Sequence, residues 1–444
     1  MIKQTALNKA KFIFGAILLF LFSLIIKINL AIPLFLLSLV IYTRRSYPGL
    51  KTKTYNLLNL SFLFVIIFSS SYLILKRGLP IFYIPFSLAA LLSIILFNNL
   101  EISFLITLAC GIAVTSIAGN NFLIVVMFLI SGILAILLAK DMRRRSVIIR
   151  TGLFIGLAQA ATLTLASRFK SQYVLSDFIL IANGIGCSII VIGILPIFEY
   201  LFKTVTNVSL LELADFHNPL LQRMVMEAPG TYHHSLIVGN LSDAACKAVG
   251  ANALLARIGA YYHDIGKLAK PEYFSENQSA FTSKHEALTP TMSKLIIMNH
   301  VKEGVELAKK YKFTPSVIDF IEQHHGNSLV YYFYRRALEN TENVEKVGEE
   351  EFRYPGPKPN SKETAIVLLA DSVEAATRAL KEADPAKIEE LVHKIINNKF
   401  IDGQLDECDL KLKDLEKISS VFIRILSGIY HGRVNYPESK KKAK

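Results

Sequence analysis

Two patterns of hydrophobic residues divide the chain near residue 205. Before that point, long apolar runs alternate with short polar segments, and most runs approach the ~20 residues that an α-helix needs to cross a bilayer. The runs cover residues 10–26, 28–42, 59–75, 79–97, 102–118, 122–139, 147–167 and 178–202. They predict a transmembrane region over residues 1–205 with about eight spans.

After the membrane half, apolar residues recur every three or four positions. This spacing indicates α-helices. The sustained alternation of apolar and polar residues that would indicate strands is absent. Three prolines stand where helices are expected to begin, at Pro290, Pro315 and Pro385. The chain is therefore predicted to be all-α, with a helical soluble domain over residues 206–438 and a basic tail at 439–444. The stretch from Glu339 to Glu363 breaks the helical pattern and predicts a long loop.

Charge is divided between the same two halves. The 444 residues carry a net charge of +13, but residues up to 205 hold 18 Lys and Arg against four Asp and Glu. A nucleic-acid-binding protein concentrates basic residues on its soluble domain, so neither DNA nor RNA is an expected partner. The basic residues instead flank the spans. The positive-inside rule then places the N-terminus, the loop "KDMRRRS" and the soluble domain in the cytoplasm. The spans contain almost no ionisable residues, which favours a sensor or an anchor over a transporter.

Histidine is confined to the soluble half. None of the ten occurs before His217, and eight lie between His217 and His325. Seven candidate metal ligands stand out on apolar helical segments: His234, His263, Asp264, His300, His324, His325 and Asp371. Each alone has an ordinary structural explanation, such as a core histidine or a helix cap. Together they would need many separate buried partners, whereas two divalent ions would satisfy them at once. A set rich in imidazole suits Fe, Mn, Co, Ni or Zn better than Mg or Ca.

Long stretches around these residues resemble a known family. The matching stretches are "EAPGTYHHSLIVGNL", "ANALLARIGAYYHDIGKLAKPEYFSENQ", "LTPTMSKLIIMNHVKEGVELA", "IEQHHG" and "FRYPGPKPNSKETAIVLLADSVEAATR". In this order they resemble the HD-domain phosphohydrolases, and specifically the seven-transmembrane HD proteins, the membrane phosphodiesterases of bacterial cyclic di-AMP. The resemblance covers nearly all of the soluble half. Through the apolar runs and the "RR" and "RRR" flanks, it also covers much of the membrane half.

The resemblance implies a multi-pass protein of the bacterial cell membrane whose cytoplasmic domain opens cyclic di-AMP to linear pApA. It also implies two divalent transition-metal ions, Fe or Mn. One ion would be held by His234, His263, Asp264 and Asp371, and the other by His300, His324, His325 and a bridging Asp264. Lys267 is expected near the scissile phosphate, with Arg378 as a second phosphate contact. The implied partners are a cyclic dinucleotide and the lipid bilayer, and a homodimer is left open.

Two departures from the family pattern are visible. Relatives carry a large extracytoplasmic domain between the first and second spans, where this chain has only a few residues around Lys27. The resemblance therefore does not indicate which signal the protein senses. The stretch "SAFTSKHEALTP" also differs from the family, so His285 is expected on the surface or on a lid rather than among the ligands.

Three other functions remain open. A cyclic di-GMP hydrolase of the HD-GYP type would carry Gly-Tyr-Pro near the histidine pair, where "QHHGNSLVYYFY" stands. A guanosine tetraphosphate hydrolase would follow its HD with an acidic pair, which "HDIGKLAK" does not contain. A receptor could bind a nucleotide without cleaving it, although it would have no physical need for a complete metal shell.

Overall fold

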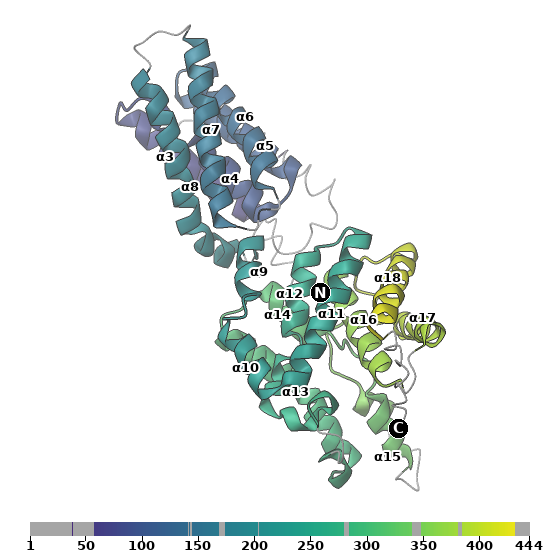
Figure 1. Cartoon of the computed structure of the whole chain (residues 1–444). Helices are drawn as coiled ribbons and strands as arrows, with labels where there is room; N and C mark the ends of the chain where they lie inside the picture. The colour runs from purple at the N-terminus through teal and green to yellow at the C-terminus, as the bar shows by residue number, and fades with distance from the viewer. Residues whose placement is uncertain are drawn as a thin grey trace, which may run out of the picture. The chain divides into compact units, whose positions relative to one another are not determined.

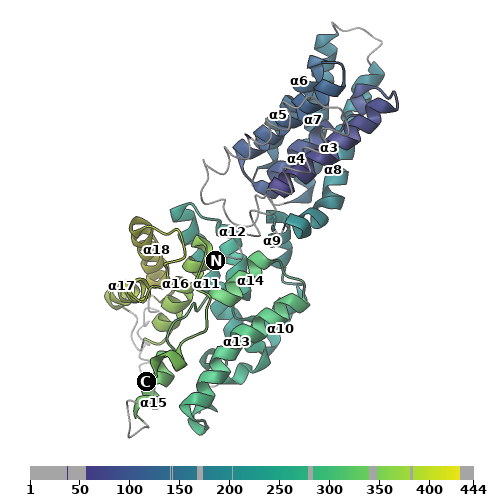
Figure 2. The same ribbon diagram turned by 180° about the vertical axis from the view of Figure 1, so that it is seen from behind.

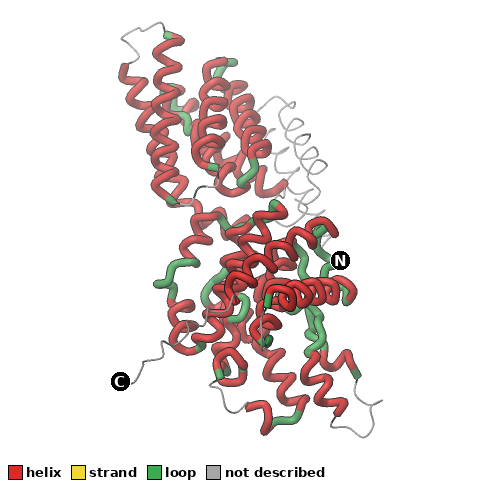
Figure 3. The backbone as a smooth tube through the Cα atoms, turned by 45° about the vertical axis from the view of Figure 1, so that its right-hand side comes forward, coloured by secondary structure: helices red, strands yellow, loops and turns green. Residues whose placement is uncertain are grey.

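The chain forms two compact units, Met1–Ser209 and Leu210–Lys444. The computed structural model describes residues 57–140, 142, 144–167, 174–202, 204–278, 284–339, 348–380 and 384–430, together with Ser38. Throughout these residues the secondary structure is helical, with no strand and one isolated bridge between Leu329 and Arg353 (Figure 3). The prediction of an all-α chain is therefore confirmed.

The described part of the first unit contains helices that coincide with the predicted apolar runs from residue 59 onward (Figure 1). They are α3 (Leu57–Lys76), α4 (Phe86–Phe97), α5 (Leu100–Ile117), α6 (Phe122–Ala139), α7 (Arg145–Ala166) and α8 (Val174–Phe202). Among them, α5, α6, α7 and α8 are long and apolar enough to cross a membrane. The runs at 10–26 and 28–42 lie outside the described residues apart from Ser38, so the total of eight spans stays a prediction.

The fourth predicted run is not one continuous helix. It contains the short 3-10 helix η2 (Ile81–Tyr83) and, after a break, α4 (Phe86–Phe97). The side-chain amide of Asn183 on α8 donates hydrogen bonds to the carbonyls of Phe82 (3.2 Å) and Ile84 (3.0 Å). Carbonyl groups in an apolar helix bundle need partners from within the protein. Asn183 therefore supports the break between η2 and α4.

The second unit is a set of short and medium helices. Its α-helices are α9 (Asn207–Leu213, which begins in the first unit), α10 (Pro219–Glu227), α11 (Pro229–Val249), α12 (Ala253–Tyr262), α13 (Pro290–Lys310), α14 (Pro315–Gln323), α15 (Tyr331–Glu339), α16 (Lys362–Arg378), α17 (Pro385–Ile401) and α18 (Leu412–Tyr430). Its 3-10 helices are η4 (Ile265–Ala269), η5 (Pro271–Tyr273), η6 (Ser275–Asn277), η7 (Lys284–Ala287) and η9 (Glu349–Phe352). The three predicted helix-start prolines lie in the first turns of α13, α14 and α17, which confirms that prediction.

Helix α16 lies in the core of the second unit. It packs against α11, α12, α14, α17 and α18 (Figures 1 and 2). Every residue from Thr364 to Asp371 is buried, as expected for a helix that is surrounded by others. Ser361 and Thr364 form a capping box that fixes where the helix begins. This helix therefore presents Asp371 and Glu374 at a rigid position inside the unit.

Candidate metal centre

Five helices and the turns between them bring the predicted ligands together. His234 lies in α11, His263 and Asp264 lie between α12 and η4, His300 lies in α13, His324 and His325 follow α14, and Asp371 lies in α16. Their ligand atoms form two groups, each with all its atoms within 4.8 Å of one another. The first group is His234, His263, Asp264 and Asp371, and the second is Asp264, His300, His324 and His325. The structure thus gathers all seven residues in the two sets that the family resemblance implied, and their coordination of metal remains a prediction.

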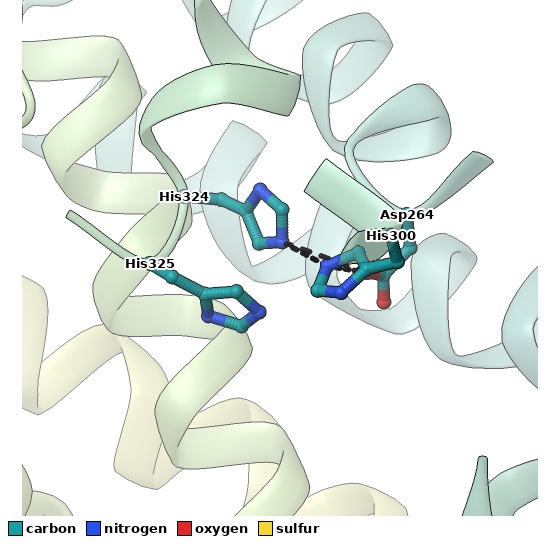
Figure 4. Close-up of side chains that lie close together, drawn as sticks. All are labelled: Asp264, His300, His324 and His325. Atoms are coloured by element: carbon teal, nitrogen blue, oxygen red, sulfur yellow. Dashed lines mark hydrogen bonds and ion pairs between the residues drawn. The ribbon is translucent and has the colours of Figure 1, made fainter. Parts of the chain in front are cut away.

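Asp264 belongs to both groups because its two carboxylate oxygens face in different directions. Oδ2 lies 3.2 Å from Nε2 of His263 and 3.6 Å from Nε2 of His234. Oδ1 lies 3.3 Å from Nε2 of His300 and 3.5 Å from Nε2 of His324. Figure 4 shows the rings of His300 and His324 beside this carboxylate, with the ring of His325 farther away. A side chain that is almost fully buried thus lies between two clusters of nitrogen donors.

The backbone selects the tautomer of three imidazoles. Nδ1 of His263 donates a hydrogen bond to the carbonyl of Ala260 (2.7 Å), and Nδ1 of His324 donates to that of Ile321 (2.9 Å). His300 makes the same bond to a carbonyl three residues earlier in α13. A neutral imidazole that donates from Nδ1 keeps a lone pair on Nε2. In their neutral form, all three rings therefore direct a lone pair toward Asp264.

These lone pairs need a cation. Nε2 of His300 lies 3.1 Å from Nε2 of His324, so two acceptors would face each other. Nε2 of His263 and Oδ1 of Asp264 are buried and find no hydrogen-bond partner among the described residues. Buried polar atoms are rarely left unpaired, and one divalent ion in each group would satisfy all four atoms. The residues present therefore fit a divalent metal.

The electrostatics of the site agree with this interpretation. Burial lowers the pKa of His324 to about 4, so this ring is neutral at pH 7. Burial alone would raise the pKa of Asp264, but His263 and Lys267 hold it well below its usual range. Burial would also lower the pKa of His263, yet Asp264 raises it to about 10. Without a metal ion, the raised pKa of His263 favours a proton on its Nε2, and metal binding has to release that proton to free the lone pair.

Sequence reasoning missed Glu374, which lies one turn after Asp371 on α16. Its side chain is buried, and its carboxylate contacts Nδ1 of His234. That contact directs Nε2 of His234 toward Asp371, at 3.0 Å. A carboxylate that orients a metal-binding histidine is a common arrangement around metal sites. The signal in the sequence was a second acid, three residues after Asp371, that follows the apolar run at residues 365–370.

Lys267 lies beside the two groups, as predicted, and Glu276 is a further residue that was missed. The Lys267 ammonium lies 2.7 Å from Oδ2 of Asp264 and 2.6 Å from Oε1 of Glu276. Arg378 approaches the other oxygen of Glu276 at 3.8 Å. Both predicted phosphate contacts are therefore joined through one buried carboxylate next to the candidate ligands. Their contact with substrate stays a prediction.

His325 is the most exposed of the candidate ligands. Its side chain is 24% exposed, whereas the side chains of the other six candidate ligands are at most 10% exposed. The ring stacks on Tyr354 with centroids 4.3 Å apart, and its Nδ1 lies 3.6 Å from Oδ2 of Asp371. Among the candidate ligands, His325 is therefore the one that solvent reaches most readily.

The prediction that His285 lies on the surface or on a lid is wrong. This residue is 7% exposed and lies on η7. Its ring packs between those of Tyr273 (5.5 Å) and Phe333 (5.0 Å), and its Nε2 is 2.8 Å from the carbonyl oxygen of Tyr273. Polar neighbours in the sequence suggested exposure, but aromatic side chains from distant segments cover the ring. His285 does not belong to either group of ligands.

Both halves of the chain are similar to known proteins. The sequence model of the family described as "7TM receptor with intracellular HD hydrolase" matches residues 12–206, and that of the HD domain matches residues 231–376. The cyclic-di-AMP phosphodiesterase PgpH of Bacillus subtilis (strain 168) is 39% identical over 96% of this chain and 62% of its own length. PgpH of Listeria monocytogenes serotype 1/2a (strain 10403S) is 41% identical over 71% of this chain and 45% of its own length.

The chain thus spans less than two thirds of these curated relatives. The crystal structure of the L. monocytogenes PgpH HD domain in complex with cyclic-di-AMP is 46% identical in sequence, covers 49% of this chain and 100% of that chain, and gives a TM-score of 0.46. Both family models lie in the predicted order along the chain, the membrane region first and the HD domain second. The chain therefore belongs to the family of seven-transmembrane receptors with an intracellular HD hydrolase domain.

Proposed function

We propose that this chain is a membrane-anchored phosphodiesterase that opens cyclic di-AMP to linear pApA with the help of two divalent metal ions. The observation that carries the proposal is the position of Asp264, whose two oxygens face two separate groups of nitrogen donors. A carboxylate shared in this way would hold two ions close together, which is the arrangement used by many phosphodiester-cleaving enzymes.

Each side chain has a defined place in this proposal. His234, His263, Asp264 and Asp371 would hold one ion, and Asp264, His300, His324 and His325 would hold the other. Imidazole and carboxylate donors suit Fe or Mn. When bound, such ions supply Lewis-acid activation of water and of the phosphodiester.

The remaining charged residues would orient the substrate. Lys267 is only 13% exposed and lies against Asp264, so it can contact a phosphate held at the two groups. Arg378, at 35% exposure, lies nearer to solvent and reaches the same region through Glu276. We assign Lys267 to the phosphate that is cleaved and Arg378 to a peripheral contact with the same substrate.

Two relatives named cyclic-di-AMP phosphodiesterase, at 39% and 41% identity, support the choice of substrate. The basic flanks of the spans support a location in the bacterial cell membrane with the HD domain in the cytoplasm. The full donor set argues against a receptor that only binds a nucleotide, because such a protein gains nothing from burying seven metal-binding groups.

The test uses the full chain, purified in detergent. Metal content is measured by mass spectrometry, and cyclic di-AMP, cyclic di-GMP and guanosine tetraphosphate are offered under reducing conditions with added Mn²⁺ or Fe²⁺. We expect two ions per chain and the fastest cleavage for cyclic di-AMP. Fewer than one ion per chain, together with no cleavage of any of the three, would overturn the proposal. Tight binding of cyclic di-AMP without turnover by the metal-loaded chain would favour the receptor.

A further inference from the structure

The turn that follows the histidine pair is held by the end of α17. The backbone N–H of Ser328 donates to the carbonyl of His325 (3.1 Å), and the N–H of Tyr354 donates to the carbonyl of Ser328 (3.0 Å). The Lys399 ammonium donates to the Ser328 hydroxyl at 2.7 Å. Through Ser328, Lys399 is therefore joined to the turn that carries His325 and to the backbone of Tyr354.

Lys399 differs from the other cations nearby in having no acidic partner. Arg353 forms ion pairs with Glu349 (2.6 Å) and Asp402 (2.9 Å). No carboxylate in the described part of the chain lies within ion-pair distance of Lys399, and the Ser328 hydroxyl accepts only one of its three N–H donors. Two N–H donors of this ammonium are thus left without a partner among the described residues.

This arrangement is costly for the folded protein. Burial lowers the pKa of Lys399, and the charge that acts most strongly against this lowering is that of Asp371, a candidate metal ligand. A partly buried ammonium without a counter-ion is destabilising. An uncharged side chain would fill the same space at lower cost, so the position calls for an anion that arrives from outside.

Resting on the proposed function, we propose that Lys399 and Ser328 form a second anion site, which binds the phosphodiester of the cyclic dinucleotide that is not being cleaved. A cyclic dinucleotide carries two phosphates in one ring. When one phosphate lies at the candidate metal centre, the other must lie to one side of it. Lys399 supplies a cation on the turn that carries His325, the most exposed of the candidate ligands. The ligand class is therefore a diester with a second phosphate, and simple one-phosphate esters should not use this site.

The test compares Lys399→Met with Lys394→Met in the full chain in detergent. Lys394 is exposed on the same helix, so its replacement removes the same charge away from the site. For Lys399→Met we expect KM for cyclic di-AMP to rise by roughly tenfold or more, as for the loss of a charged hydrogen bond, with kcat and metal content within about twofold of wild type. Lys394→Met should keep the wild-type KM. Lys399→Arg, which retains the charge, should restore most of the affinity.

A diester with a single phosphate distinguishes binding at the candidate metal centre from binding at Lys399 and Ser328. Bis(p-nitrophenyl) phosphate, whether cleaved or only competing with substrate, should lose less than twofold in affinity with Lys399→Met. Equal losses for both compounds, or a fall in kcat and metal content, would show a structural role through the His325 turn and overturn the proposal. If Lys399→Met does not fold, Lys399→Gln gives the same comparison because its amide can still bond Ser328. Wild-type protein that cleaves no cyclic dinucleotide would refute the proposed function, whereas an unchanged KM in an active variant refutes only this second site.

Discussion

At the scale of single residues, the shared carboxylate has the largest consequence. Each oxygen of Asp264 faces a different group of imidazoles, and the side chain is almost fully buried. An amide in its place would lose the charge and direct N–H groups toward at least one set of lone pairs. The residue is therefore a single point on which both candidate metal positions depend.

We predict that Asp264→Asn lowers metal content from two ions to fewer than one per chain and reduces cyclic di-AMP hydrolysis at least 100-fold. Metal analysis and product chromatography on the same sample measure both effects. The control is His285→Ala, which removes a buried ring outside both groups. It should lower the melting temperature, at a cost of about 1–3 kcal/mol, and leave the metal content at two. Two retained ions in Asp264→Asn would show that the carboxylate is not shared.

Glu374 acts through His234 rather than by direct coordination. Its carboxylate holds Nδ1 of His234, which leaves Nε2 to face Asp371. We predict that Glu374→Gln weakens the ion in the His234 group by about tenfold, within the range known for groups that orient metal ligands. The ion in the His300 group should keep its affinity. Metal titration followed by calorimetry measures the two affinities, and Glu390→Gln on the exposed side of α17 is the matched control. Equal weakening of both ions would contradict this role.

The candidate ligands that meet at the site could be picked out from the sequence, whereas Glu276 could not. Histidine and aspartate on apolar helices are conspicuous because burial requires a partner. Glu276 gave no such signal, since it stands in the polar stretch "PEYFSENQ". Its burial comes from contacts with Lys267 and, 45 residues earlier in the chain, with Thr231. Residues of this kind depend on pairings between distant segments, which local composition does not contain.

At the scale of secondary structure, the predicted helices were found because their spacing is a local property. The stretch from Glu339 to Glu363 was predicted as a long loop, yet its described part contains η9 and Phe352, which is 2% exposed. Phe352 packs against Phe333 of α15 in a small separate core. This segment also includes Tyr354, which stacks on His325. Apart from η9 and the flanking helix ends, the described part of the stretch is a loop, as predicted. The contacts that order it come from other elements, so helical periodicity does not reveal them.

The close packing of η4 against α13 sets the distance between Asp264 and His300. A Cβ added to Gly266 would lie 1.8 Å from the carbonyl oxygen of His300 and 2.5 Å from the backbone nitrogen of Gly304. We predict that Gly266→Ala separates Asp264 from His300, destabilises the fold by more than about 3 kcal/mol and removes the ion of the His300 group. Denaturant unfolding and metal analysis measure these effects. In Gly428→Ala on α18, where the added methyl meets no atom within 4 Å, stability should rise by about 0.5–1 kcal/mol.

At the scale of the whole molecule, the described membrane helices determine which loops share a side of the bilayer. Three helices, α4, α5 and α6, separate Arg77 from Arg144. Helix α4 has only 12 residues, which at ~1.5 Å per residue is short of the ~30 Å apolar core. It can complete a crossing only together with the η2 segment, whose carbonyls Asn183 satisfies. If the run at residues 79–97 crosses the membrane, the loops that contain Arg77 and Arg144 lie on opposite sides of it.

We predict that Arg77→Cys is labelled by a membrane-impermeant maleimide in intact cells, whereas Arg144→Cys is labelled only after lysis. Both positions are exposed, and the positive-inside rule places the loop rich in arginine in the cytoplasm. The natural cysteines give little background, because Cys110, Cys187 and Cys246 are buried, and Cys408→Ser removes the fourth. Labelling of both positions from outside would mean that α4 does not cross, and labelling of Arg144→Cys alone would reverse the orientation. Either result would contradict the predicted side of the HD domain or the predicted number of spans. The chain crosses twice more after Arg144, through α7 and α8, so the segment after α8 lies on the same side as Arg144.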